Sequence, residues 1–543
     1  MHCALIKKTC SKNSTCPINY IVTCRKNKKN LSAGLGGHFM GFEPIYEKLA
    51  PAGFKRLCNS QAVVEARLLA SGGVLISKVL SIAADCSVTA GDVFTGEARY
   101  SGRVSFKVLF TCKEGLNHSM DYNADFTDKL LCDTLKAGLK PFVSASILDV
   151  DIVAVDEREI KLACVVETSL DAVLEQSVDV LANGGEGIYT HTKKIEFFKS
   201  VNSVVHNFTL TDKVDLKGAR VLLSEARAVV KNSTASFDSA IVEGNIVCDL
   251  TCEDSDGMIY SVVHTTPFKE ELSCTDTRDN HFLIASASLA NHAVTVESDN
   301  DKHSALLEFS LNGAAKVFSQ ETQEVIVDAF SVANELDFSG EEIAVCVQKN
   351  NLTFSDRVEG AVTLDANMPI ADSILGLTGS KLHIASAVAS EGRVTYEGMV
   401  STNIIYFAAE GSVKNSVAVE LPFSISTTLA GALDGDTILA RGIVTLATAK
   451  LVRGNEISIK ADIDVEVIAS SEAKHFVLTN LNLGEERILS DAAFSVHMAK
   501  GGETLWDVAK SLGITPESVL EQNPSLELPL AGGERVMCYR QKK

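Results

Sequence analysis

Apolar and polar residues alternate along most of the chain between residues 60 and 490, and this alternation predicts β-strands. One pattern of strand, turn and strand occurs three times, at residues 100–126, 242–268 and 396–423. In each copy a glycine in the first strand is followed by a phenylalanine in the second, after 24, 24 and 25 residues. Turns that contain glycine and charged residues separate the two strands, as in β-hairpins. We interpret the three segments as copies of one unit.

A second pair of alternating segments follows each hairpin, at residues 144–166, 284–309 and 440–461. The copies begin 142 and 154 residues apart, which is far above the period of about 20–50 residues found in solenoid repeats. We therefore expect a mainly β chain with three tandem domains, each an antiparallel, sandwich-like repeat. Their expected bounds are residues 40–195, 196–345 and 346–490.

Residues 491–543 follow a different pattern, which predicts a strand, two helices and a second strand. Residues 494–499 alternate, and Gly501 and Gly502 supply a tight turn. Thr504 can cap a helix that ends at Gly513, because glycine readily takes the left-handed conformation of a C-terminal cap. The apolar face of this helix comprises Leu505, Val508, Ala509 and Leu512.

The second helix of this segment is expected to begin at Pro516, since proline suits the first turn of a helix. Val519 and Leu520 are expected to face inward, and Asn523 with Pro524 ends the helix. Residues 534–539 then return as the second strand. The segment is therefore predicted to be a small α/β module.

This ordered segment resembles a LysM module. In that family the ligand, usually a polymer of N-acetylglucosamine, lies in a shallow groove between the turn before the first helix and the loop after the second. The resemblance implies a partner or glycan site formed by Gly502, Glu503, Thr504 and Leu505 on one side and by Asn523, Pro524, Ser525 and Leu526 on the other. The sequence departs from the family at Glu503, where Asp is frequent, and at Cys538 and Tyr539, which replace an Ile-Pro ending. It stays open whether the groove binds protein or glycan.

Trp506, the only tryptophan of the chain, lies at the border of the apolar face of the first predicted helix. Two interpretations stay open for it, packing at the edge of the core and an exposed anchor for a partner. Affinity at a shallow groove depends on a few apolar side chains, so we count Trp506 and Leu526 among the expected binding residues.

The formal net charge of −20 over 543 residues narrows the classes of partner. Such a chain repels nucleic acid and anionic membranes, so proteins and neutral glycans remain as the candidate partners. Hydrophobic residues make up 46% and charged residues 22% of the chain, as in ordinary globular proteins. No run of about 18 or more uncharged apolar residues occurs, so no membrane span is expected.

Residues 1–39 differ from the rest, because they contain seven basic residues and no acidic ones. Four cysteines lie in this segment, but no CxxC pair sets the spacing of a zinc site. Its longest apolar run is far too short for a secretory signal. We regard the segment as a basic extension and hypothesise that it is upstream sequence wrongly included when the start of the reading frame was assigned.

The other ten cysteines lie mostly singly within apolar or alternating runs, as in proteins of a reducing compartment. With no secretory signal, the chain is expected to be cytoplasmic. No nucleophile elbow, phosphate-binding loop or zinc-protease motif occurs, so we expect neither an enzyme nor a cofactor. Cys248 and Cys252 are expected to pack, and the turn at residues 254–257 is expected to be a hairpin turn, because it lacks the acidic twelfth residue of a calcium loop.

The repeated units and the C-terminal module together resemble the SPOCS-domain, LysM-containing spore-coat morphogenesis proteins of clostridial spore formers. The resemblance covers residues 60–543 and is carried by the glycine-containing strand, the turn and the Pro-Phe pair, followed by the module. The first copy departs from it, with Asp125 where Pro267 and Pro422 stand. The resemblance implies a scaffold made in the mother cell and located at the forespore surface or in the spore coat. Its LysM module would contact the morphogenetic ATPase that forms the coat basement layer.

Two other functions stay open. A peptidoglycan- or chitin-type glycan-binding protein of the cell wall would use the same groove, although the missing secretion signal disfavours it. A hydrolase with catalytic residues hidden among the β units has no motif in its favour. The leading hypothesis is therefore a non-enzymatic intracellular scaffold that docks a protein partner through residues 491–543.

Overall fold

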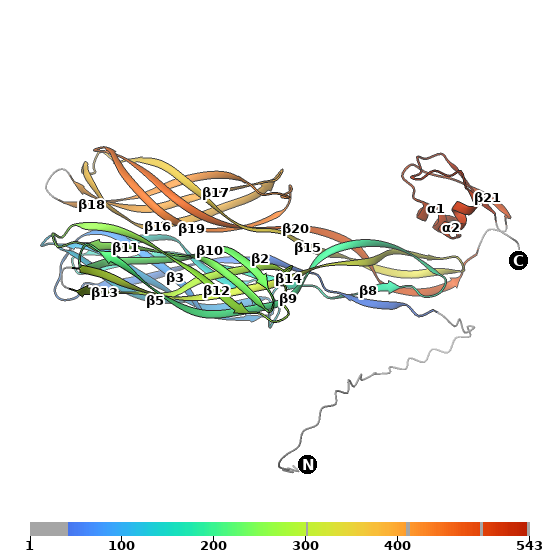
Figure 1. The fold of residues 1–543 in the computed structure, drawn as a ribbon, viewed down its shortest axis with the longest axis horizontal. Coiled ribbons are helices and arrows are strands. Elements are labelled where there is room, and N and C mark those ends of the chain that lie inside the picture. The colour runs from blue at the N-terminus through green and yellow to red at the C-terminus, as the bar shows by residue number, and fades with distance from the viewer. Residues whose placement is uncertain (1–41, 300–301, 409–412, 489–491, 540–543) are drawn as a thin grey trace, which may run out of the picture. The chain divides into compact units, whose positions relative to one another are not determined.

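The computed structural model of the protein describes residues 42–299, 302–408, 413–488 and 492–539 (Figure 1). The expected extension at residues 1–39 lies outside the described residues. The described residues from Glu43 onward form one compact unit. The described chain is mainly β, with several antiparallel sheets, as the alternation of apolar and polar residues predicts.

Three six-stranded units with the same topology follow one another along the chain. In each unit the second, third and fourth strands form one antiparallel sheet, and the first, sixth and fifth strands form another. Each unit has its own buried apolar core, to which strands of both sheets contribute. Each unit is therefore a small sandwich of two three-stranded sheets.

The first unit consists of β2 (Ala52–Leu69), β3 (Ile76–Phe94), β4 (Glu97–Cys112), β5 (Asn117–Leu131), β6 (Phe142–Asp156) and β7 (Glu159–Glu175). The second unit consists of β9 (Ile188–Leu216), β10 (Arg220–Ser236), β11 (Ser239–Glu253), β12 (Ile259–Ser273), β13 (Phe282–Asp299) and β14 (Lys302–Ser331). The third unit consists of β15 (Asn334–Thr363), β16 (Ala371–Ser390), β17 (Arg393–Ala408), β18 (Lys414–Thr428), β19 (Thr437–Arg453) and β20 (Glu456–Glu486).

The repeated glycine and phenylalanine lie directly opposite each other on paired strands. The pairs are Gly102 with Phe126, Gly244 with Phe268, and Gly398 with Phe423. A Cβ atom on Gly244 would lie 2.5 Å from the ring of Phe268 and 2.1 Å from the carbonyl oxygen of Val229. Gly102 is similarly close to the ring of Phe126 and to a carbonyl oxygen, whereas a Cβ atom on Gly398 would first meet the carbonyl oxygen of His383. In all three copies only glycine leaves room for the neighbouring backbone.

A β-bulge recurs at the same place in the second strand of each unit, and the bulged residue is a leucine each time. These residues are Leu80, Leu222 and Leu375. They form one apolar cluster together with Leu109, Leu223, Ile259 and Ile405, so all three units contribute to it. The three sandwiches are therefore joined by a common core as well as by their connecting strands.

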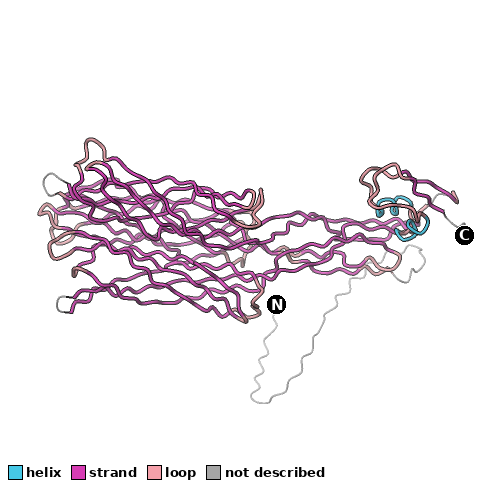
Figure 2. The backbone as a smooth tube through the Cα atoms, turned by 45° about the horizontal axis from the view of Figure 1, so that its top comes forward, coloured by secondary structure: helices cyan, strands magenta, loops and turns pink. Residues whose placement is uncertain are grey.

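Further strand segments continue beyond the sandwiches and form a second β region, which we call the stem (Figure 2). Its ribbons are β1 (Ile45–Leu49) with β8 (Val178–Asn183), the start of β9 with the end of β14, and the start of β15 with the end of β20. Side chains from all three ribbons meet in its apolar core, among them Leu49, Phe197 and Val345. The boundaries expected at residues 195/196 and 345/346 fall inside β9 and β15, because these strands run unbroken from the stem into a sandwich.

The last elements are β21 (Phe494–Met498), α1 (Leu505–Leu512), α2 (Pro516–Gln522) and β22 (Arg535–Tyr539). We call the described residues 492–539 the C-terminal module. Its two strands pair in an antiparallel ribbon, and the two helices lie between them in sequence. The predicted order of strand, helix, helix and strand is observed.

Candidate functional site: the C-terminal module

Helix α1 begins with a capping box. The Thr504 hydroxyl accepts a hydrogen bond from the Asp507 amide at 3.2 Å, and the Asp507 carboxylate accepts one from the Thr504 amide at 2.9 Å. Gly513 ends the helix with a φ of 65°, and Pro516 lies in the first turn of α2. The cap at Thr504, the glycine stop and the proline start are thus confirmed.

The second helix buries less than the sequence pattern predicts. Val519 is fully buried, whereas Leu520 is 39% exposed, so the expectation that both face inward is wrong for Leu520. Successive residues of a helix point about 100° apart, and a helix of seven residues presents only a narrow face to its core. Only the residue on that face is buried.

On the first side of the predicted groove, Glu503 is held by groups of the module itself. Its carboxylate accepts hydrogen bonds from the Lys500 amide at 2.8 Å and from His497 Nε2 at 3.0 Å. The bond from His497 and that from the backbone amide hold the pKa of Glu503 below its usual value. Gly502 forms the preceding turn with a φ of 80°, and open space surrounds it.

On the second side, Asn523 has a structural role. Its side chain donates to the Met537 carbonyl at 2.8 Å and accepts from the Met537 amide at 2.7 Å, so it ties the end of α2 to β22. Asn523 is 5% exposed. The neighbouring Pro524 and Ser525 are exposed.

Leu505 and Leu526, from opposite sides of the predicted groove, are half-buried and pack against the same core. The structure thus brings the two sides together in one small module. The exposed members of the predicted site are Gly502, Thr504, Pro524 and Ser525. A partner or glycan at this groove would therefore meet mostly small side chains and backbone.

Trp506 packs against the stem. Its indole Nε1 donates to Asp328 at 2.8 Å, and its ring centroid lies 4.9 Å from that of Phe330 and 5.2 Å from that of His191. Asp328 and Phe330 belong to β14, and His191 belongs to β9, its partner strand in the stem. Of the two interpretations of Trp506, packing describes its position in this structure.

Lys510 strengthens the same contact. Its ammonium group lies 2.6 and 2.8 Å from the two carboxylate oxygens of Asp328. Lys510 follows Trp506 by four residues, so both side chains project from one face of α1. In addition, the Arg487 guanidinium donates to the Lys510 carbonyl at 3.1 Å. One carboxylate of the stem therefore binds two donors of the same helix.

The stem residues of this contact were not identified from the sequence. Asp328 and Trp506 are 178 residues apart in the chain, and no local pattern connects them. The sequence does mark Asp328 as unusual, because it is the only charged residue in the otherwise apolar stretch from Val325 to Phe330. A lone acid in a buried strand usually has a partner, but the sequence does not say which.

An apolar surface that the sequence analysis did not single out lies on the outer face of the β21–β22 ribbon. Its residues are Phe494, Val496, Met498, Met537 and Tyr539, each between 39% and 55% exposed. Phe494 and Tyr539 are directly paired, with ring centroids 5.0 Å apart. These side chains point away from the core because inward and outward positions alternate along each strand.

The other residues considered as possible metal or calcium sites have structural roles. Among the described residues, no group of three or more His, Cys, Asp or Glu side chains could hold a metal ion. Cys248 and Cys252 are fully buried on β11, and burial raises the pKa of their thiols to about 12 and about 11. Residues 254–257 form the hairpin turn between β11 and β12, as expected.

Comparison of the chain with models of protein families, with curated proteins and with solved structures finds no match in any of the three. The likeness to LysM and SPOCS-domain proteins therefore stays a resemblance carried by the motifs. Over the described ranges, neither helix is long and apolar enough to cross a membrane.

Proposed function

We propose that this chain is a non-enzymatic scaffold of spore-coat assembly, which docks a coat-basement morphogenetic ATPase through its C-terminal module. The motifs described above suggest the partner. The observation that supports the proposal is how the module is held. One helix is fixed to the stem through Trp506 and Lys510, whereas Pro524 and Ser525 on the second side of the predicted groove are exposed.

A scaffold binds best when a rigid body positions the binding element. The apolar cluster around Leu80, Leu222 and Leu375, which we call the leucine cluster, joins the three sandwiches. The long strands continue from the sandwiches into the stem that holds the module. In this proposal the protein acts in the mother cell, at the forespore surface and later in the coat. The acidic chain would then meet protein partners and not nucleic acid.

Binding of the ATPase by the full chain tests the proposal. Ser525→Arg places a long charged side chain in the exposed part of the predicted groove, and we expect it to weaken binding at least tenfold. Ala493→Arg makes a similar change at an exposed position before β21 and outside that groove, and we expect it to leave affinity unchanged. Equal affinity of the two variants would show that the groove is not the docking surface.

Sedimentation with purified peptidoglycan separates the proposal from its main rival. If the full chain binds peptidoglycan strongly, fails to bind the ATPase, and loses glycan binding on Ser525→Arg, the protein is a glycan-binding protein and the scaffold proposal is wrong. We expect the opposite result, with ATPase binding and no sedimentation.

A further inference from the structure

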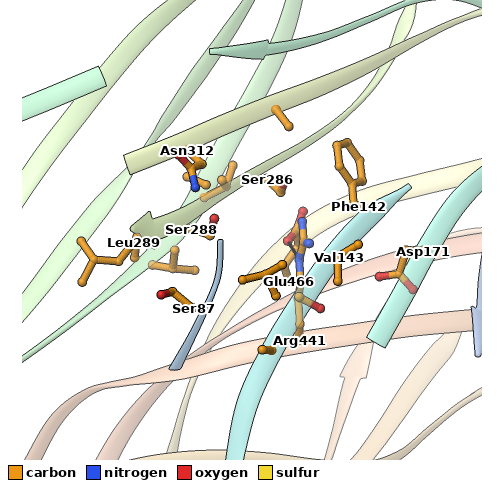
Figure 3. Close-up of a pocket in the computed structure, with 18 of the residues that line it drawn as sticks. Ser87, Phe142, Val143, Asp171, Ser286, Ser288, Leu289, Asn312, Arg441 and Glu466 are labelled. Carbon is orange, nitrogen blue, oxygen red and sulfur yellow. Dashed lines mark hydrogen bonds and ion pairs between the residues drawn. The ribbon is translucent and has the colours of Figure 1, made fainter. Parts of the chain in front are cut away.

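The fifth strands of the three units, β6, β13 and β19, all line a cleft of about 360 Å³ (Figure 3). Other strands of the same three units also line the cleft, among them β3, β10, β14 and β20. Figure 3 shows Arg441 and Glu466 side by side among smaller side chains such as Ser286 and Ser288. The volume lies in the range of about 300–1,000 Å³ that is typical of small-molecule sites, which often form between domains.

The three units contribute different residues at the same structural position of this cleft. In the first unit Ser144 pairs with Ser169, and in the second unit Ser286 pairs with Ala314. In the third unit the corresponding pair is Arg441 with Glu466. At this position small side chains in two units leave the space open, and only the third unit has an ion pair there. The repeat pattern therefore does not require this pair for folding of a unit.

Glu466 is incompletely paired, although it is buried. Arg441 Nε donates to its Oε2, and Arg441 Nη2 donates to the Ala285 carbonyl at 2.8 Å. The other oxygen, Oε1, accepts no hydrogen bond from any described residue, and Glu466 is only 3% exposed. A buried carboxylate oxygen without a donor is unfavourable, and native structures usually provide one. Glu466 lines the cleft, but Oε1 itself has almost no accessible surface, so a donor in the cleft reaches this oxygen only when the Glu466 side chain rotates toward it.

The charge of the cleft limits what the donor can be. Asp171, which also lines the cleft, is bound by Arg56 at 2.8 and 3.2 Å, and Glu466 is bound by Arg441. Both carboxylates are thus neutralised by guanidinium groups. A buried cation would lack a counter-charge, and an anion would face the free oxygen of Glu466. A neutral hydroxyl can donate to that oxygen at no such cost.

We propose that this cleft binds a small neutral polyhydroxylated molecule, of the sugar or cyclitol class, with one hydroxyl donating to Glu466 Oε1. Ser286, Ser288 and Asn312 line the same space and offer further hydroxyl and amide groups. Alanine and valine side chains provide the remaining walls. The site is separate from the C-terminal module, so it does not depend on the scaffold function proposed above.

Calorimetric titration of the full chain with myo-inositol, sucrose and N-acetylglucosamine at millimolar concentration tests the proposal. At least one of them is expected to bind with 1:1 stoichiometry. Putrescine and citrate, as a cation and an anion, are expected not to bind. Glu466→Gln removes the charged acceptor, and we expect it to weaken binding at least tenfold.

Two further variants separate loss of the site from loss of the fold. Ser288→Phe fills the cleft from an exposed position and keeps the ion pair, so it should abolish binding without lowering the melting temperature. Asp462 lies on the same strand as Glu466 and forms an ion pair with Arg357 at the surface. Asp462→Asn removes the charge from this ion pair and should leave binding unchanged. The proposal is wrong if none of the three polyols binds, if putrescine or citrate binds, if binding survives both cleft variants, or if crystals grown with a polyol hold only water at Glu466.

Discussion

Removal of the Asp328 carboxylate should weaken the docking of the C-terminal module on the stem. Asp328→Ala deletes the acceptor of the Trp506 indole and the partner of Lys510. A hydrogen bond to a charged group contributes about 1.5–3 kcal/mol. The side chain of Lys510 is 38% exposed, so its ion pair adds only about 0.5 kcal/mol. We expect the docked state to lose about 2 kcal/mol, which is roughly thirtyfold in the ratio of docked to released module.

The single tryptophan makes this prediction measurable by fluorescence. Because Trp506 is the only tryptophan of the chain, its emission reports on this contact alone. In Asp328→Ala we expect a red-shifted emission maximum and stronger quenching by iodide, with an unchanged far-ultraviolet circular-dichroism spectrum. Asp328→Asn keeps an acceptor for the indole and should show an intermediate effect. Glu324→Ala removes an exposed acid from the same strand and should change neither signal.

Unchanged iodide quenching in Asp328→Ala would refute the reasoning, because the indole would then be held by something other than this carboxylate. The same variant also decides between the two interpretations of Trp506. If Trp506 is a partner anchor, its release should tighten binding of the coat ATPase. If Trp506 serves only to hold the module, affinity for the ATPase should stay the same.

Three further predictions concern the β units. Burial, with a smaller contribution from Asp85, raises the pKa of Glu225 from 4.5 to about 7, so this group's contribution to stability is lost as the pH rises from about 4.5 to about 7. Glu225→Gln should therefore raise the melting temperature more at pH 8 than at pH 5, and an equal shift at both values would contradict this. Gly244→Ala should cost at least 1–3 kcal/mol in urea unfolding, because its Cβ would overlap a carbonyl oxygen and a phenyl ring. Gly91→Ala, whose nearest contacts would be at 3.5 Å, should cost much less, and similar losses would disprove the packing argument. Leu222→Ala should cost about 2–5 kcal/mol in the same assay, and a loss below about 1 kcal/mol would mean that the leucine cluster does not join the units.

Local patterns determined the elements of this protein. The alternation of apolar and polar residues predicted the hairpins, because the two faces of a strand meet different surroundings. The caps of α1 could be predicted from Thr504 and Gly513, since a helix end depends on hydrogen bonds and backbone angles within a few residues. The glycine-to-phenylalanine spacing of 24 or 25 residues marked the repeats, and in the structure the two residues lie opposite each other on paired strands.

Only the tertiary structure decided how these elements combine. The bulged leucines look like ordinary strand residues in the sequence, yet they meet at the centre of the three units. Alternation also does not show where a strand passes from one apolar core into another. Each of β9 and β15 keeps one partner strand along its whole length and crosses an expected domain boundary without a signal. Trp506 with Asp328, and the cleft around Arg441 and Glu466, depend on residues far apart in the chain. A sequence pattern records the periodicity of one segment, whereas pairing between distant segments is fixed by the shape and charge of surfaces that exist only after folding.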